Sequence, residues 1–143
     1  MIDMRITRLF FDRKAVTDRV GRATKRVLSR FGAYVRQTAR RSIRKRKAVS
    51  QPGQPPSSHT GLLKRFIFFG YDTGRQSVVM GPARLTGGNR GEAPPLLEYG
   101  GRTRRRDRKG QTVRARYKAR PFMGPAFEAN KKLLPQMWAK SVR

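Results

Sequence analysis

Apolar positions in the first third of the chain recur at the spacing of a helix. Steps of three or four residues separate Val16, Val20, Ala23, Val27, Phe31, Val35 and Ala39. Leu28, Tyr34 and Ile43 widen this stripe. Because Asp12 is a suitable N-cap residue, the spacing predicts one long helix from about Asp12 to about Arg46. A single apolar stripe on an otherwise polar helix is typical of a helix packed on a core.

Shorter segments alternate apolar and polar residues, as half-buried strands do. Alternation in 1–11 predicts a first strand, ahead of the helix. The segment 61–71 reads GLLKRFIFFGY and predicts a second strand, either directly or after one helical turn at 62–64. Turn residues at 72–75 and the apolar segment 76–81 complete a predicted hairpin.

The segment 48–60 is too rich in proline for regular structure, so we interpret it as a loop within one domain. Another loop is predicted at 82–95, before the short apolar segment 96–100. The segment 101–110 reads GRTRRRDRKG and predicts a basic loop. Alternation in 111–119 predicts a strand or the far arm of an extended hairpin over 101–118.

A final helix is predicted at 126–142, with Pro125 at its first position. Pro135 is expected to kink this helix or break it in two. Its expected buried side comprises Phe127, Leu133 or Leu134, Met137 and Trp138. The chain has 143 residues, the size of one domain. We therefore expect a single α+β domain over 1–143, with the long N-terminal helix packed on a small, mostly antiparallel sheet and a C-terminal helix.

Charge changes this picture more than any other property of the composition. Thirty-five Lys and Arg residues oppose eight Asp and Glu residues, which gives a formal net charge of +27. Self-repulsion at this charge opposes compaction unless an anion screens it. Nucleic acid is the obvious screen because each neutralised phosphate releases counterions. An anionic membrane or an acidic protein surface would serve the same purpose.

Residues that carry chemistry are scarce. The chain has no Cys, its one histidine is His59 in the proline-rich loop, and its acids are scattered singly. No Walker-type phosphate loop and no nucleophile elbow occurs. We therefore expect neither an enzyme nor a cofactor or metal site. The longest apolar run, at 66–69, is far shorter than the roughly 20 residues of a membrane-spanning helix, so no membrane partner is expected.

Two candidate sites emerge in the last third of the chain. Glu98 lies among apolar neighbours, and a partly buried carboxylate there is expected to pair with an Arg, within the chain or across a subunit interface. A second candidate, for polyanion contact without sequence reading, comprises Arg102, Arg104, Arg105, Arg106, Arg108 and Lys109. No helix-turn-helix, zinc finger or RNA-binding sheet motif accompanies them, so such binding should depend strongly on salt.

The order of several short segments resembles a known family. A long helix precedes Thr60-Gly61-Leu62-Leu63 and a strand, a second strand ends at Val79-Met80-Gly81, and Pro95-Leu96-Leu97-Glu98-Tyr99-Gly100 follows. Ala119-Arg120-Pro121-Phe122-Met123-Gly124-Pro125-Ala126-Phe127 then opens the terminal helix. Over most of the chain this resembles the tail-completion and tail-terminator (neck) family of tailed bacteriophages and prophages. The positions that match its two motifs are Glu98, Tyr99 and Gly100, then Arg120, Pro121, Phe122 and Pro125.

The resemblance implies a virion protein of the neck, assembled in the host cytoplasm, with the motif residues at a subunit interface. It also implies an α+β domain that forms a homo-oligomeric ring, often hexameric, between head connector or stopper proteins and the tail-tube protein. Such a ring ends tail-tube growth, and genomic DNA passes through its lumen. The high charge and the basic segment 101–118 depart from the family, so we hypothesise that basic loops face the lumen or acidic neighbours. The alternative is a non-specific nucleic-acid-binding protein, such as a ribosomal or ribonucleoprotein component.

Overall fold

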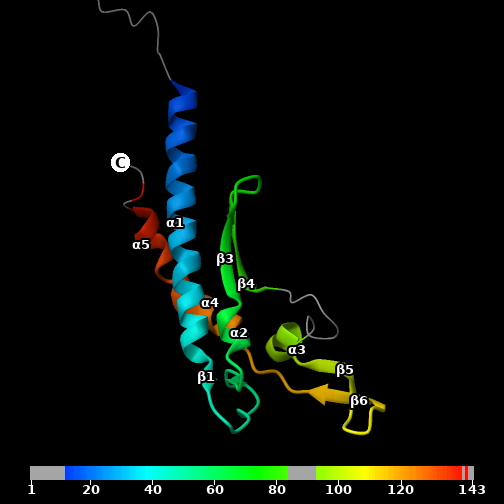
Figure 1. Cartoon of the computed structure of the whole chain (residues 1–143). Coiled ribbons are helices and arrows are strands. Elements are labelled where there is room, and N and C mark those ends of the chain that lie inside the picture. The colour runs from blue at the N-terminus through cyan, green and yellow to red at the C-terminus, as the bar shows by residue number, and fades with distance from the viewer. Residues whose placement is uncertain (1–11, 84–92, 140, 142–143) are drawn as a thin grey trace, which may run out of the picture.

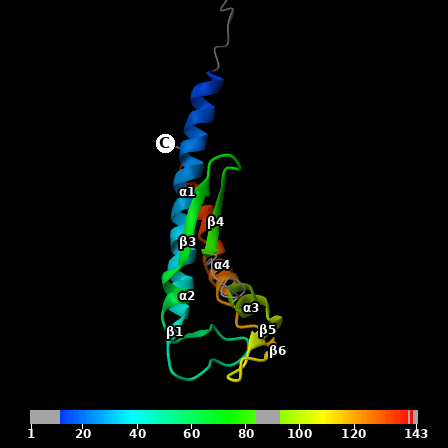
Figure 2. The same cartoon turned by 45° about the vertical axis from the view of Figure 1, so that its right-hand side comes forward.

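One long helix organises the molecule. The computed structural model describes residues 12–83, 93–139 and 141, and its longest element is α1 (Arg13–Ser42). The β3–β4 hairpin lies alongside the C-terminal part of α1, and α4 and α5 contact the helix as well (Figures 1 and 2). The fold is α+β, as predicted. The strand predicted at 1–11 lies outside the described residues.

The boundaries of α1 follow from its side chains. Asp12 caps the helix, because its Oδ1 accepts a hydrogen bond from the Ala15 N–H at 2.9 Å. The helix ends at Ser42, four residues before the predicted end at Arg46, and Ile43 is extended. Continuing the helix would place Arg44 and Lys45 one turn beyond Arg40 and Arg41, and like charges at that spacing repel.

The chain leaves α1 as a short strand. This strand, β1 (Arg44–Lys45), pairs in parallel with β2 (Ser57–Ser58). The predicted loop at 48–60 therefore contains a two-residue strand. Arg44 and Lys45, which the predicted helix included, therefore lie on β1, directly after the fully buried Ile43.

The predicted hairpin is confirmed. A helical turn, α2 (Leu62–Arg65), precedes β3 (Ile67–Asp72), which pairs antiparallel with β4 (Ser77–Pro82). Asp72 closes the turn between them, since its Oδ1 accepts from the N–H groups of Gly74 at 3.0 Å and Arg75 at 3.2 Å.

Gly32 sets the distance between α1 and this hairpin. A Cβ atom at Gly32 would lie 2.7 Å from Cγ2 of Val78 and 3.0 Å from Cδ2 of Phe69, on the helix-facing side of the hairpin. Arg36 fixes the same contact, because its Nε donates to the Ile67 carbonyl at 2.7 Å. The close packing therefore requires a residue without a side chain at position 32.

The core lies where α1, β3 and α4 (Met123–Lys131) meet. Its fully buried members are Phe31, Val35, Ala39, Ile43, Ile67, Phe122 and Ala126. The predicted stripe of α1 continues beyond this core, since Val16 and Val20 are 45% and 46% exposed. Their part of α1 extends past the tip of the β3–β4 hairpin (Figure 1), so no core element covers it.

The predicted C-terminal helix is two helices, α4 and α5 (Leu134–Ala139). A continuous helix would bring the ring of Pro135 against the carbonyl of Lys131, so the chain breaks before it. Pro125 is the third residue of α4, and its predicted first position is wrong.

The buried side of the two C-terminal helices is only partly as predicted. Leu134 and Met137 pack on the core, as expected. Phe127, Leu133 and Trp138 are instead exposed by more than a third, while Ala126 and Asn130 are buried. Asn130 donates to Thr38 Oγ1 at 2.9 Å and to the Ala126 carbonyl at 2.7 Å, which satisfies its amide N–H groups.

The last elements are a short helix and a second hairpin. Helix α3 (Ala93–Tyr99) takes up the end of the loop predicted at 82–95, and residues 84–92 of that loop lie outside the described residues. Strand β5 (Gly101–Arg106) pairs antiparallel with β6 (Thr112–Tyr117). The loop predicted at 101–110 is therefore wrong, and the hairpin interpretation of 101–118 is confirmed.

Candidate functional site

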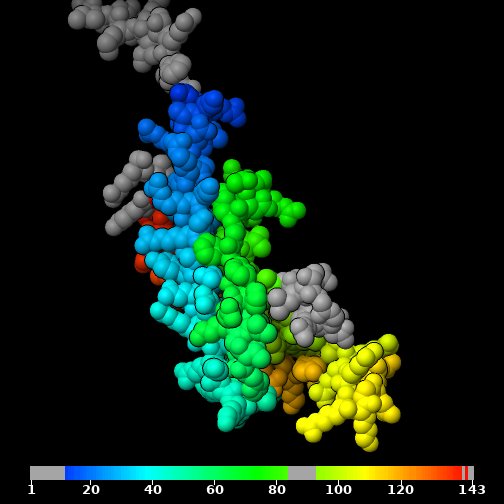
Figure 3. All heavy atoms as spheres, in the orientation of Figure 1, coloured from blue at the N-terminus to red at the C-terminus, as the bar shows by residue number. Residues whose placement is uncertain are grey.

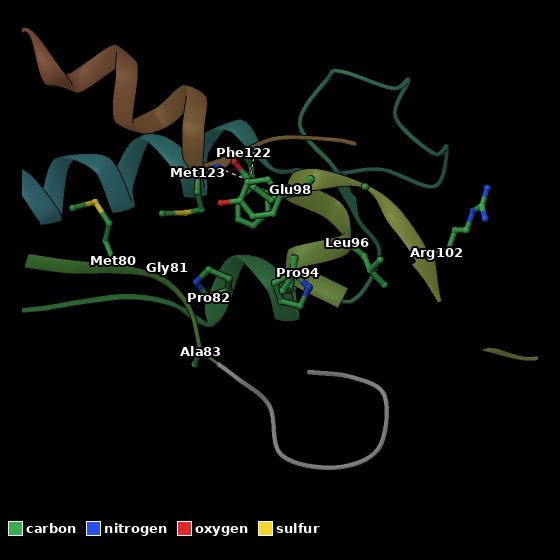
Figure 4. Close-up of a pocket in the computed structure, with 13 residues that line it drawn as sticks. Met80, Gly81, Pro82, Ala83, Pro94, Leu96, Glu98, Arg102, Phe122 and Met123 are labelled. Carbon is green, nitrogen blue, oxygen red and sulfur yellow. Dashed lines mark hydrogen bonds between the residues drawn. The ribbon is translucent and has the colours of Figure 1, made fainter. Parts of the chain in front are cut away.

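Glu98 joins the two motif segments. From α3, its Oε2 accepts hydrogen bonds from the N–H groups of Phe122 at 2.9 Å and Met123 at 3.0 Å. Its Oε1 accepts from the Gly124 N–H at 2.7 Å (Figure 4). Among the described residues these backbone N–H groups, and not an Arg, are the partners of Glu98. The alternative, pairing with an Arg across a subunit interface, stays a prediction.

This carboxylate completes the N-terminus of α4. The first four N–H groups of a helix lack partners within the helix, and negative charge is favourable there. Phe122, the N-cap residue, offers no capping side chain. Glu98 binds the N–H groups of Phe122, Met123 and Gly124, and Pro125, the next residue and the third of α4, has none. Glu98 and Pro125 thus leave no donor unsatisfied in this turn.

Two glycines keep the junction tight. A Cβ atom at Gly124 would lie 3.1 Å from Glu98 Oε1, so a side chain there would crowd the cap. Gly100 ends α3 with φ of +72°, and a Cβ atom there would lie 2.9 Å from the Tyr117 carbonyl oxygen. Its N–H donates to the Leu96 carbonyl at 2.9 Å. Close backbone approach and positive φ therefore require glycine at position 100, whereas at position 124 the neighbour is the carboxylate of the Glu98 side chain.

Arg120 ties the junction to the proline-rich loop. Its Nε donates to the Ser50 carbonyl at 2.9 Å, and its backbone N–H donates to the Leu97 carbonyl. The Gly53 N–H in turn donates to the Ala119 carbonyl at 2.9 Å. The second motif thus holds the loop 48–60 and α3 together.

The remaining motif residues differ in exposure. Phe122 is 1% exposed and anchors α4 in the core, whereas Tyr99 is 83% exposed. Pro121, half-buried, leads from Arg120 into α4. The fold therefore accounts for most of the motif, but it leaves the Tyr99 ring to solvent or to a partner.

A hollow of about 780 Å³ lies beside the junction. Its walls come from the end of β4, from α3 and from the start of α4 (Figure 4), and they include Met80, Pro82, Pro94, Leu96 and Met123. Glu98, Tyr99 and Arg102 are the titratable side chains on its wall. The Glu98 oxygens already accept three hydrogen bonds, so the hollow is mainly an apolar surface.

The β5–β6 register divides the predicted polyanion residues. Arg102 lies opposite Arg116, Arg104 opposite Arg114, and Arg106 opposite Thr112. Because directly opposite residues share a face of the hairpin, these six exposed side chains project from one side. We call this set the Arg face.

The other predicted contact residues lie elsewhere. Arg105 is on the opposite face with Val113, and Arg108 and Lys109 lie in the turn. Asp107 closes that turn, since its Oδ1 accepts from the N–H groups of Lys109 at 2.8 Å and Gln111 at 2.9 Å. The predicted set is therefore spread over three surfaces.

Arg114 and Arg116 were not among the predicted contact residues. Their alternation with Val113, Ala115 and Tyr117 indicates one face of a strand. Only the pairing of that strand with a basic partner strand brings them beside Arg102 and Arg104.

Within the described ranges, no helix is long and apolar enough to cross a membrane. The same residues hold no group of three or more His, Cys, Asp or Glu side chains placed to bind a metal ion. Comparison with protein-family models, with curated proteins and with solved structures finds no match.

Proposed function

We propose that this protein is a structural component of a phage neck. It forms a ring that ends the tail tube and joins it to the head connector, and genomic DNA passes through the lumen. The observation that carries this proposal is the Glu98 junction. The two segments on which the family resemblance rests form one structural unit, although Glu98 and Phe122 are 24 positions apart in the sequence.

The junction supports the proposal because it gives the motif residues a common purpose. Glu98, Phe122 and Pro125 complete the start of α4, and Gly100 and Arg120 hold the neighbouring chain against it. A resemblance by chance would not require its matched positions to contact one another. The unit presents Tyr99 outwards, and tyrosine is enriched at protein interfaces.

Exposed apolar side chains support a role in assembly. On the outer face of the β3–β4 hairpin, Phe68 is 48% exposed and Val79 is 65% exposed. Among the described residues, each sheet has two strands, so both edges of this hairpin are open. Open edges and exposed apolar side chains are what a second subunit would cover.

The test is whether the purified chain forms closed rings. Negative-stain images and mass photometry of the full chain are expected to show one ring species. Addition of the chain to polymerising tail-tube protein from the same phage is expected to shorten the tubes. A chain that stays monomeric at all concentrations and leaves tube length unchanged contradicts the proposal.

The Arg face favours a second candidate, a non-specific nucleic-acid-binding protein such as a ribosomal or ribonucleoprotein component. It presents five Arg side chains on one exposed surface. This candidate predicts a monomer that binds RNA at low salt and forms no rings. The ring experiment therefore separates the two candidates.

A further inference from the structure

The β5–β6 hairpin has two unlike faces. One is the Arg face, whose members Arg102, Arg104, Arg106, Thr112, Arg114 and Arg116 are all exposed. The other carries the half-buried Thr103, Val113, Ala115 and Tyr117, and the exposed Arg105. Thr103, Arg105 and Tyr117 line a hollow together with Leu96 and Leu97 of α3, so this second face is turned to the body of the protein, and Arg104 and Arg106 border the same hollow. The hairpin projects from that body at one end of the molecule (Figure 3).

The Arg face is electrostatically unfavourable on its own. Arg102 and Arg116 are directly opposite, and like charges in such positions destabilise a strand pair. The nearest acid in sequence, Asp107, uses its Oδ1 to bind backbone N–H groups of the turn. A bound anion would offset the repulsion.

We infer that the Arg face binds the phosphate backbone of duplex DNA. The core of a protein–protein interface is largely apolar, whereas this face carries five Arg side chains, one Thr and no apolar side chain. Single-stranded nucleic acid is held by several aromatic side chains on which successive bases stack. Tyr117 is on the opposite face, and one exposed ring, Tyr99 of α3, borders the Arg face beside Arg102 and Arg116. A face made almost entirely of Arg matches phosphate groups, because the guanidinium of Arg binds a phosphate with two parallel hydrogen bonds.

The dimensions of the face suit a backbone. Alternate residues on a strand are about 6.6–6.8 Å apart, so Arg102 and Arg106 are separated by about 13 Å. Duplex DNA carries one charge per roughly 1.7 Å of its axis, so several phosphates fall within this length. Phosphate contacts carry no sequence information, so binding is expected to be independent of base sequence.

If the bound DNA is the genome passing through the ring, this inference rests on the proposed function. DNA binding and ring formation are nevertheless measured in separate experiments. The face variant replaces Arg102, Arg106, Arg114 and Arg116 with Gln in the full chain. The control variant makes the same change at Arg13, Arg19, Arg22 and Arg26, which are exposed on α1. Both variants lose four positive charges. A difference in their affinity for DNA therefore reports the arrangement of the Arg side chains and not the net charge of the protein.

The measurement is fluorescence anisotropy of two short duplexes of different sequence, titrated at several salt concentrations. For the face variant, the slope of log K against log salt is expected to fall by about 3 to 4, near 0.9 per lost contact. Its affinity is expected to drop at least about tenfold more than that of the control at one salt concentration. Arg→Lys changes at the same four sites keep the charge and should weaken binding less, which separates loss of contacts from misfolding.

Three results would overturn the inference. Equal losses in the face and control variants would show that only net charge matters. Tighter binding of poly-dT than of duplex would exclude a duplex site, and tighter binding of polyglutamate would indicate an acidic protein partner. Rings imaged for a face variant that no longer binds DNA would support both proposals. Face-dependent DNA binding by a chain without rings would support this inference and contradict the neck function.

Discussion

At the scale of single residues, Glu98 resolves a conflict at position 122. The N-cap of a helix favours a small polar side chain, but Phe122 is needed in the core, where it is 1% exposed. One residue cannot serve both purposes, so α3 supplies the missing acceptor through Glu98. The cap therefore also fixes α3 against α4, and local helix stability becomes coupled to tertiary structure.

Replacement of Glu98 should destabilise the protein. Glu98→Ala leaves three N–H groups without acceptors, and hydrogen bonds to charged groups contribute roughly 1.5–3 kcal/mol each. Because Glu98 is only half-buried, water replaces part of this, and we expect a loss of about 2–4 kcal/mol. Glu98→Gln keeps one acceptor oxygen and should lose about half as much. Urea denaturation followed by circular dichroism measures both.

The matched control for this prediction is Glu128→Gln in α4, the helix whose N-terminus Glu98 binds. Glu128 forms an exposed pair with Lys131 at 3.7 Å, and such pairs contribute little. Its change should leave the free energy of unfolding within about 0.5 kcal/mol. If Glu98→Ala were as mild as this control, the capping role of Glu98 would be wrong.

Gly100 offers a second test at this scale. Gly100→Ala places a methyl group 2.9 Å from the Tyr117 carbonyl oxygen, in a conformation that L-residues avoid. Gly110→Ala is the control, because Gly110 also has positive φ but its Cβ would meet nothing within 4 Å. We expect a loss of about 1 kcal/mol at Gly110 and about 2–4 kcal/mol at Gly100, by urea denaturation. Equal losses would mean that only φ matters.

The sequence singled out Glu98 for a sound reason but could not supply its partner. An acid among apolar residues needs a partner, and the abundance of Arg in the chain suggested one. The actual donors are backbone N–H groups. Every residue except proline has one, so the residue type does not indicate which of them binds the carboxylate. Only the placement of the α4 N-terminus beside α3 reveals them.

At the scale of elements, the packing of α1 on the β3–β4 hairpin makes opposite predictions for two glycines. Gly32→Ala gains helix propensity but forces its Cβ to 2.7 Å from Val78, so we expect a net loss of about 1–2 kcal/mol. Gly21→Ala in the same helix meets nothing within 4 Å and should stabilise by about 0.5–1 kcal/mol. Thermal unfolding of both variants measures the difference. A stabilising Gly32→Ala would contradict the close helix–hairpin contact.

Elements were predictable where side-chain pattern and burial agree. The β3–β4 hairpin shows an apolar run, a turn and a second apolar run, and the prediction was correct. The pattern left β5 open between a basic loop and one arm of a hairpin, because four of its six residues are Arg, which gives no apolar alternation. Its structure comes from pairing with β6, whose apolar side chains are turned to the body of the protein. Pairing between strands is a tertiary property that the pattern of one strand does not contain.

At the scale of the whole molecule, two extended surfaces, the polar sides of α1 and the Arg face, carry 15 of the 35 Lys and Arg residues behind the net charge of +27. The core is confined to the meeting point of α1, β3 and α4. A small core must therefore hold together a molecule whose surface repels itself. This balance makes stability depend on the ions in solution.

Salt should stabilise the protein. The Debye length shrinks from about 30 Å at 0.01 M to about 8 Å at 0.15 M, so repulsion between α1 and the Arg face is screened over that range. We expect the melting temperature to rise with NaCl in thermal unfolding followed by circular dichroism. The face variant, with four fewer charges, should show a smaller rise. A melting temperature that falls with salt would mean that attractive ion pairs outweigh the repulsion.

A polyanion should stabilise the chain at far lower concentration than NaCl does. A ligand that binds only the folded state adds about 2.7 kcal/mol at 100 times its Kd, which corresponds to a rise of about 10 °C for a domain of this size. Short duplex DNA at low salt should therefore raise the melting temperature of the wild type, and the rise should grow with DNA concentration. The face variant should gain much less, because it retains the core but lacks the phosphate contacts. An equal gain in both would place DNA binding outside the Arg face, on cations that lack the paired arrangement of β5 and β6.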